Sequence, residues 1–299
     1  MWRYGVMWFG IASAASAVLF IKASNMPPVT LAWMRLLIAA IALTPVMLYT
    51  LRTTRYRFTR VDLLASLPGA VLLALHFVTW IIGVRQTTAA NSTLIVNLLP
   101  VAMPFAMYLA ERQRIGRGEI VGTILALLGA ILLSVGGLDL SRSQFKGDLW
   151  GALAMLLAVA YMTFGRIRGR GRPIFVYIVP LYWIATPVAF CFSLGELDAY
   201  PPLTTREVLM VLGLGLIPTV IGHSISNWSM VHLPSQVVAI CNLGQFIVAA
   251  VLAAILLHEY PTLRYFPAAA LVIAGAVVVI RSAPRPVTRA IEAAQAQTD

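Results

Sequence analysis

Two stretches of the chain decide its fold: LLASLPGAVLLALHFVTWIIGV at residues 63–84 and REVLMVLGLGLIPTVIGHSISNWSM at residues 206–230. Each is apolar over the ~20 residues that a helix needs to cross a bilayer, and each carries one histidine, His76 or His223. Similar pairs recur about 145 residues apart elsewhere, so the second half of the chain repeats the first. Those pairs are Gly5-x-x-Trp8 with Gly147-x-x-Trp150, Glu111 with Glu259, and Gly129-Ala130 with Gly275-Ala276.

The composition is that of a protein embedded in a lipid bilayer. Apolar residues make up 60% of the chain and charged residues only 11%, whereas soluble proteins have about 25% charged residues. The formal charge of +11 comes from short basic clusters between apolar segments, which is typical of membrane orientation signals. We therefore expect the bilayer as a partner and no nucleic acid. Cys191 and Cys241 both fall in apolar segments, so neither a disulfide framework nor a metal site is expected.

The apolar segments number ten, five in each half of the chain. In lipid only helices and closed barrels satisfy the backbone, and continuous segments of this length are helices. Because five is odd, the second copy must lie upside down relative to the first. The sequence predicts an all-α integral membrane protein whose ten transmembrane helices form two inverted five-helix repeats. The predicted spans are Tyr4–Ile21, Val29–Leu51, Leu63–Val84, Thr88–Ala110, Gly118–Gly136, Asp148–Gly165, Ile174–Leu194, Arg206–Met230, Ser235–Leu257 and Leu263–Ile280.

The loops set the domain boundaries and the orientation. We expect the first repeat at 1–138, an extracytoplasmic linker at 139–147, the second repeat at 148–281 and a disordered cytoplasmic tail at 282–299. Of the 22 lysines and arginines, 15 fall on one side of the predicted spans and 6 on the other, with Arg35 inside a span. The positive-inside rule then places both termini in the cytoplasm. The triplet at 15–17 is similar to a signal-peptide cleavage site, but the repeat of Gly5-x-x-Trp8 favours a retained span.

No Asp or Glu lies deep inside a predicted span. Cation-coupled pumps and exporters of cationic drugs generally place a carboxylate within the membrane. We therefore expect a cargo that is neutral, zwitterionic, or a carboxylate with a large apolar surface. Arg35 is the one clear charge inside a span, and its role has two interpretations. It either anchors a substrate carboxylate, or it is a structural arginine that bonds helix carbonyls or extends toward the membrane surface.

Four spans carry polar and aromatic side chains in stripes. Residues three or four positions apart share a helix face, and such stripes either bond helix to helix or line a common cavity. Stripes on four spans that the repeat pairs favour a substrate cavity. The histidines in these stripes have an ordinary pKa near neutrality, so a proton-coupling or gating role and a structural role both stay open. The candidate residues are His76, Thr79, Trp80, Asn97, Tyr108, His223, Asn227, Asn242, Gln245 and Phe246.

A family resemblance emerges from the order of several short motifs. With ten spans in two repeats, residues 4–281 resemble the EamA-type drug/metabolite transporter superfamily. The resemblance implies a basket-like bundle around a central cavity lined by spans three, four, eight and nine. It also implies export of amino acids and related metabolites from bacteria. The motifs are Pro28-x-x-Leu31-x-x-x-Arg35 opening the second span, Thr87-Thr88-Ala89-Ala90 before the fourth, Pro100 through Glu111-Arg112 within it, and Glu259 ending the ninth.

The resemblance also narrows the expected cargo. Abundant Trp and Tyr are similar to the branch that exports aromatic amino acids, although Asn242-Leu243-Gly244-Gln245 stands where many relatives have a proline. We expect a monomeric secondary transporter of the bacterial inner membrane that exports aromatic or bulky neutral amino acids by alternating access. No cofactor is expected.

Two alternatives to this function stay open. The first is transport of another metabolite or drug, such as a purine or a nucleotide sugar. The second is an intramembrane enzyme with Ser224 as nucleophile. Ser224 lacks the Gly-x-Ser-x-Gly setting, and its neighbour His223 points about 100° away on a helix, so no catalytic residue is expected.

Overall fold

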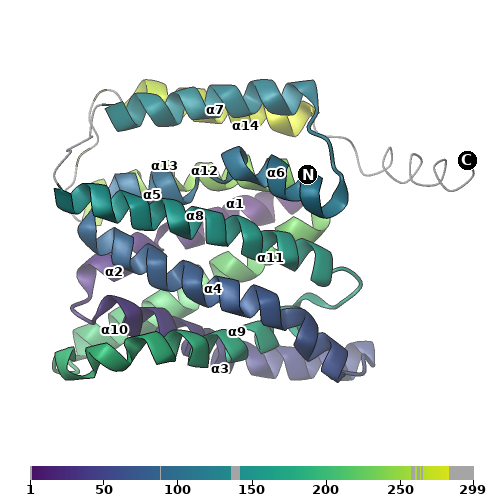
Figure 1. Cartoon of the computed structure of the whole chain (residues 1–299), viewed down its shortest axis with the longest axis vertical. Coiled ribbons are helices and arrows are strands. Elements are labelled where there is room, and N and C mark those ends of the chain that lie inside the picture. Colours follow the sequence, from purple (N-terminus) through teal and green to yellow (C-terminus); the bar gives the residue numbers. More distant parts are fainter. Residues whose placement is uncertain are drawn as a thin grey trace, which may run out of the picture.

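The computed structural model consists of helices that run back and forth between two opposite faces of the molecule (Figure 1). It describes residues 2–87, 89–135, 142–256, 260, 263 and 265–282. Over these ranges the secondary structure is helical, with no strand. The first half contains α1 (Trp2–Ala15), α2 (Ala17–Ala23), α3 (Pro28–Thr54), α4 (Arg60–Gln86), α5 (Ala89–Val96), α6 (Leu99–Glu111) and α7 (Arg117–Val135). The second half contains α8 (Arg142–Arg168), α9 (Ile174–Ser193), η1 (Leu194–Ala199), α10 (Thr205–Leu214), η2 (Gly215–His223), α11 (Ser224–His232), α12 (Ser235–Leu243), α13 (Gln245–Leu256) and α14 (Tyr265–Ser282).

These helices confirm the predicted all-α membrane fold. Among the described residues, nine helical stretches are long and apolar enough to cross a bilayer. The predicted fifth span corresponds to α7, which has 19 residues. Several spans consist of two or three consecutive helices, such as α5 with α6 and α12 with α13.

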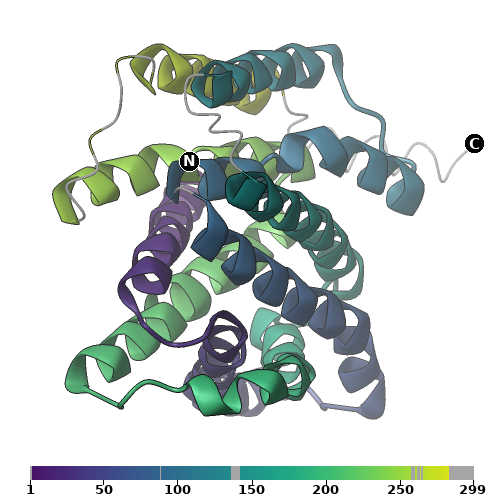
Figure 2. The same cartoon turned by 60° about the vertical axis from the view of Figure 1, so that its left-hand side comes forward.

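The packing pairs helices of the first half with helices of the second (Figures 1 and 2). α7 lies along α14, and α3 lies along α9. α4 packs against α8, while the corresponding pair in the other copy, η2 and α1, also packs together. Exchanging each span for its counterpart therefore converts these contacts into one another, as a two-fold relation between the halves predicts. The inverted relation itself stays a prediction.

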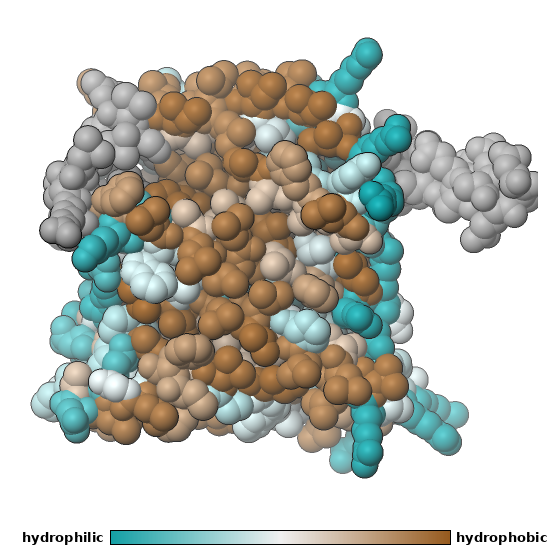
Figure 3. Space-filling view, in the orientation of Figure 1, coloured by the Kyte–Doolittle hydropathy of each residue, from teal (hydrophilic) through white to brown (hydrophobic). Residues whose placement is uncertain are grey.

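The surface is divided into zones that match a bilayer. Figure 3 shows hydrophilic residues along two opposite edges and a broad hydrophobic band between them. Large apolar side chains such as Phe105, Leu109 and Ile255 are exposed on this surface. Because lipid tails are as apolar as these side chains, the exposed band needs no protein cover.

Acidic side chains lie at the two ends of the bundle, where they form ion pairs or hydrogen bonds near helix termini. We call the face with the turns at 55–59, 112–116 and 169–173 the inner face, and the opposite one the outer face. On the inner face Glu111 pairs with Arg166 at 3.1 Å, and Asp62 with Arg172 at 2.8 Å. On the outer face Glu196 accepts from the backbone N–H of Thr30 at 2.8 Å, in the first turn of α3. The expected absence of carboxylates from the span interiors thus holds for the described residues, and Glu259 lies outside them.

The predicted boundaries differ from the structure at the junction of the halves. α8 begins at Arg142, so part of the predicted linker at 139–147 is helical. Residues 142–147 include Arg142, Gln144 and Lys146, and hydropathy does not detect a helix that extends into this polar stretch. Positions 139–141 and the predicted tail from 283 onward lie outside the described residues.

Candidate functional site

Four spans depart from a regular α-helix within their length, and the first span does so at Ser16, between α1 and α2. α5 ends at Val96 and α6 begins at Leu99, with Pro100 in the first turn of α6, where its missing N–H is tolerated. α12 ends at Leu243 and α13 begins at Gln245. The eighth span contains η2, a π-helical segment around Pro218. Irregular backbone at membrane depth occurs where protein surrounds it or where it lines a cavity.

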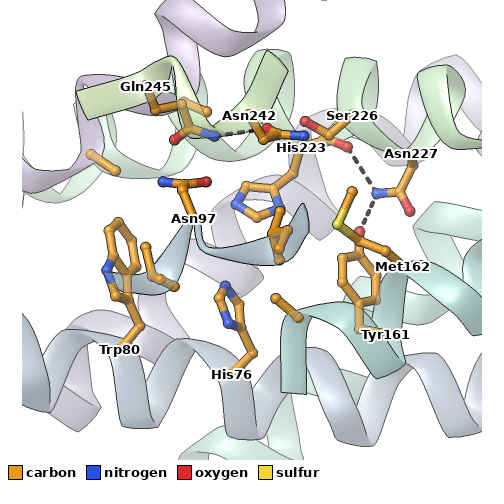
Figure 4. Close-up of a pocket in the computed structure, with 15 residues that line it drawn as sticks. His76, Trp80, Asn97, Tyr161, Met162, His223, Ser226, Asn227, Asn242 and Gln245 are labelled. Atoms are coloured by element: carbon orange, nitrogen blue, oxygen red, sulfur yellow. Dashed lines mark hydrogen bonds between the residues drawn. The ribbon is translucent and has the colours of Figure 1, made fainter. Parts of the chain in front are cut away.

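A cavity lies at these irregular points, between helices of both halves (Figure 4). Its empty volume is about 600 Å³ with the adjoining open space included. The described lining combines uncharged polar groups and aromatic rings with small apolar side chains. It consists of Ala14, Ala17, His76, Trp80, Val96, Asn97, Leu99, Ala158, Tyr161, Met162, His223, Ser226, Asn227, Asn242 and Gln245.

The wall formed by α4 is aromatic. The rings of His76 and Trp80 lie parallel, 6.3 Å apart between centroids, and the His223 ring faces them from the opposite span at 6.4 Å from His76. Nδ1 of His76 lies 2.8 Å from the carbonyl oxygen of Ala154. Because a carbonyl only accepts, this nitrogen carries the proton, and Nε2 of the neutral ring is left as an acceptor.

Three asparagines of the lining are oriented by their own helices. Each donates from Nδ2 to the backbone carbonyl four residues earlier. Because that carbonyl can only accept, the facing atom must be the amide nitrogen, and Oδ1 must point the other way. The three bonds are Asn97 to Thr93 at 2.9 Å, Asn227 to His223 at 2.8 Å and Asn242 to Val238 at 2.9 Å.

The carboxamide of Gln245 is oriented by that of Asn242. Nε2 of Gln245 donates to Oδ1 of Asn242 at 2.8 Å, so Oε1 of Gln245 is the free end. On the opposite side of the cavity, Nδ2 of Asn227 also donates to the hydroxyl of Tyr161, which leaves the hydroxyl proton available as a donor. The cavity therefore presents amide oxygens at one wall and a hydroxyl donor at the other.

Arg35 lies behind the cavity and does not line it. The side chain is fully buried, and Nε donates to Oγ1 of Thr219 in η2 at 2.9 Å. The guanidinium stacks on Phe77, with Cζ 3.8 Å from the ring centroid, and lies 5.7 Å from the centroid of Trp80. Among the described residues neither Nη1 nor Nη2 has a hydrogen-bond partner. This arrangement lacks the helix carbonyls that a structural arginine would bond.

The structure brings most of the predicted site residues together. Seven of the ten candidates line one cavity, as the stripes on spans three, four, eight and nine predicted. These seven are His76, Trp80, Asn97, His223, Asn227, Asn242 and Gln245. Their contact with a substrate stays a prediction.

Three predicted residues lie elsewhere. Thr79 donates to the carbonyl of Leu75 in its own helix at 2.8 Å. Tyr108 is 45% exposed and points away from the cavity. Phe246 is fully buried and packs edge-on against Tyr265 at 5.7 Å between centroids. The expectation that Tyr108 and Phe246 contact a substrate in the cavity is therefore wrong for this structure.

Sequence reasoning missed the contribution of the first and sixth spans. Tyr161 and Met162 of α8 line the cavity, and Ala14 and Ala17 face it from the first span. These residues stand in apolar runs that show no polar stripe. The repeat could have indicated these residues, because α8 and the first span are counterparts. A cavity between the two copies is expected to be lined by residues of both counterparts.

Three observations concern the alternative of an intramembrane enzyme. Among the described residues no group of three or more His, Cys, Asp or Glu side chains is placed to hold a metal ion. Ser224, the candidate nucleophile, lines a separate surface pocket with Trp2 and Trp228. The described lining has no carboxylate for acid–base work.

Comparisons with known proteins agree with this architecture. Residues 3–135 and 145–281 match the EamA-like transporter family. The uncharacterized transporter YdfC of Bacillus subtilis (strain 168) is 25% identical over 201 residues, which cover 66% of this chain and 63% of that relative. The chain thus matches less than two thirds of that relative's length. A solved crystal structure has a TM-score of 0.73 at 17% identity and covers 95% of this chain and 99% of its own, which shows a shared fold.

Proposed function

The chain belongs to the EamA-like transporter family, and from this premise we propose that it exports amino acids and related metabolites across the bacterial cytoplasmic membrane. Its family and its multi-pass helical fold make it a membrane transporter. The cargo, the direction and the mechanism are inferred from the cavity and from the distribution of charge.

One observation carries the proposal: the described lining is polar and aromatic but contains no charged side chain. A bulky neutral amino acid would place its side chain against Trp80 and its polar end among the amides and the Tyr161 hydroxyl. Aromatic pairs add about 0.5–1.5 kcal/mol beyond area burial. That amount biases the selection of cargo without making its release slow.

The mechanism that suits this site is alternating access. We propose that the two halves are inverted repeats that rock about the cavity, as in other secondary transporters. The breaks at Asn97 and Gly244 lie beside the cavity, where spans four and nine would bend. The excess of basic residues on the inner face supports cytoplasmic termini, and the bundle is proposed to act as a monomer.

The alternative cargoes and the enzyme fit less well. A nucleotide sugar needs cationic partners for its phosphates, and no Lys or Arg stands in the described lining. A hydrolase needs Ser224 beside a base, and Ser224 lies outside this cavity.

Uptake into proteoliposomes tests the proposal. We expect saturable uptake of labelled phenylalanine and tryptophan and weaker uptake of a small polar amino acid. Trp80→Leu should raise KM for phenylalanine about tenfold, the effect of ~1.4 kcal/mol of lost ring contact. Phe105→Leu is the matched control, because Phe105 is an aromatic residue 72% exposed on the hydrophobic surface. Well-folded protein that takes up no amino acid would overturn the proposed cargo.

An imposed pH gradient separates proton coupling from facilitated diffusion. The described lining has no carboxylate to carry a proton, so we expect uptake driven by the substrate gradient alone. The two histidines are the remaining candidates for coupling. Uptake that accelerates with the gradient, and loses this response in His76→Gln or His223→Gln, would contradict facilitated diffusion.

A further inference from the structure

The cavity has two electrically different ends. We infer that it binds a zwitterion with the carboxylate toward His223 and the Tyr161 hydroxyl and the ammonium toward the amide oxygens of Asn97 and Gln245 (Figure 4). The inference rests on the proposed function and specifies how the amino acid is recognised and oriented.

The carboxylate end is defined by the charge of Arg35. Cζ of Arg35 lies 3.8 Å from the Phe77 ring centroid, and that centroid lies 4.8 Å from the centroid of His223. The sum of these distances, 8.6 Å, is the greatest possible separation between Cζ and the His223 ring centre. No Asp or Glu among the described residues forms an ion pair with Arg35. Its positive charge therefore acts on this end of the cavity without a neighbouring counter-charge.

The size of this effect follows from the distance. At an effective dielectric constant of about 20, a unit charge about 8.6 Å away changes binding about 25-fold. The sign is favourable for a carboxylate near His223 and unfavourable for an ammonium in the same place. Arg35 thus orients a zwitterion without touching it.

Hydrogen-bond donors stand at the same end. The Tyr161 hydroxyl accepts from Asn227 and keeps its own proton to donate. Neither ring nitrogen of His223 has a hydrogen-bond partner within the described part of the chain, and the neutral ring carries one N–H. Both groups line the cavity, so a carboxylate would find two donors.

The opposite end is defined by acceptors. Asn97 uses Nδ2 on Thr93, and Gln245 uses Nε2 on Asn242. The oxygens Oδ1 of Asn97 and Oε1 of Gln245 then have no partner among the described residues, and these side chains reach into the cavity from the break between α5 and α6 and from α13. Carbonyl oxygens accept from an ammonium but not from a carboxylate. These acceptors and the donors of His223 and Tyr161 are therefore complementary to the two charges of an amino acid.

The experiment compares three probes of one shape: phenylalanine, phenethylamine without the carboxylate, and 3-phenylpropionate without the ammonium. Each competes for labelled phenylalanine uptake in proteoliposomes, and each is also tested for direct binding by the thermal shift of the purified protein. We expect phenylalanine to bind at least tenfold more tightly than either analogue.

Two variants of Arg35 test the source of the selectivity. Arg35→Gln should weaken phenylalanine binding about tenfold, less than the 25-fold of a carboxylate alone because the repulsion of the ammonium is removed as well. For that reason it should strengthen phenethylamine binding. Arg35→Lys keeps the charge and should stay close to wild type. If Arg35→Gln fails to fold, Arg35→Met, which also removes the charge, takes its place in the three-probe comparison.

The outcomes distinguish the inference from the proposed function. Phenylalanine uptake that phenethylamine inhibits equally well would overturn the zwitterion site and leave the amino-acid exporter standing. A selective thermal shift with phenylalanine but no uptake would support the site and overturn the transport proposal. No shift and no uptake with any zwitterion would overturn both.

Discussion

Replacing Arg35 by methionine separates the two interpretations of this residue, because they give different signs for thermal stability. Methionine has a similar volume and an unbranched chain but no charge. If Arg35 is structural, its replacement should lower the free energy of unfolding. If Arg35 is instead retained for its charge beside the cavity, its replacement should leave the free energy of unfolding unchanged or raise it slightly.

The contacts of Arg35 give the size of the change. Removing its charge from water costs several kcal/mol, about 5, and two of its nitrogens have no partner among the described residues. In return, the bond to Thr219 contributes about 2 kcal/mol, and the rings of Phe77 and Trp80 together about 2 kcal/mol. Arg35→Met should therefore raise the free energy of unfolding by about 0–2 kcal/mol, which raises Tm by about 0–5 °C.

Arg166 is the matched control for this measurement. It is also buried, but it pairs with Glu111 and donates to the carbonyls of Met230 and Leu233. Arg166→Met removes one member of this buried pair and should lower stability by about 3 kcal/mol, or Tm by about 8 °C. Unfolding of the detergent-purified variants, followed by fluorescence during heating, measures both. A fall for Arg35→Met as large as that for Arg166→Met would refute the reasoning.

A close glycine contact and a cavity hydroxyl give two further predictions. A Cβ on Gly275 would clash with the carbonyl oxygen of Gly122 and lie 2.8 Å from the backbone nitrogen of Ala126, so Gly275→Ala should lower Tm by about 5 °C or more. Gly5→Ala, with nothing within 4 Å, should not change Tm. Tyr161→Phe should raise KM for phenylalanine about tenfold and leave phenethylamine inhibition unchanged; equal effects on both would contradict a carboxylate contact at this hydroxyl.

The positions of the helices could be predicted because the bilayer sets their length and charged residues mark their ends. The predicted span at 63–84 corresponds to α4 at Arg60–Gln86, and the span at 118–136 to α7 at Arg117–Val135. The early start of α8 could not be predicted in the same way. Its first turns are polar, and hydropathy measures the apolar part of a helix rather than the whole helix.

The site residues could be predicted from the helix period within a continuous helix or close to a break, but not beyond a break. His76 and Trp80 are four residues apart in the continuous helix α4, and both line the cavity. Asn97 and Tyr108 are 11 residues apart, about three turns of a regular helix, but the break after α5 resets the phase and turns Tyr108 outward. A sequence period cannot show a break that tertiary packing imposes.

The same carboxamides support both interpretations of the polar stripes, because each group divides its hydrogen-bonding capacity. The Nδ2 of Asn97 bonds its own helix, which fixes the side chain, while its oxygen stays available to the cavity. Gln245 divides its donor and its acceptor in the same way through Asn242. A site built from such half-used groups is rigid before cargo arrives, and it offers neutral hydrogen bonds of about 1 kcal/mol each rather than ion pairs. That strength suits a transporter, which must select its cargo on one side of the membrane and release it on the other.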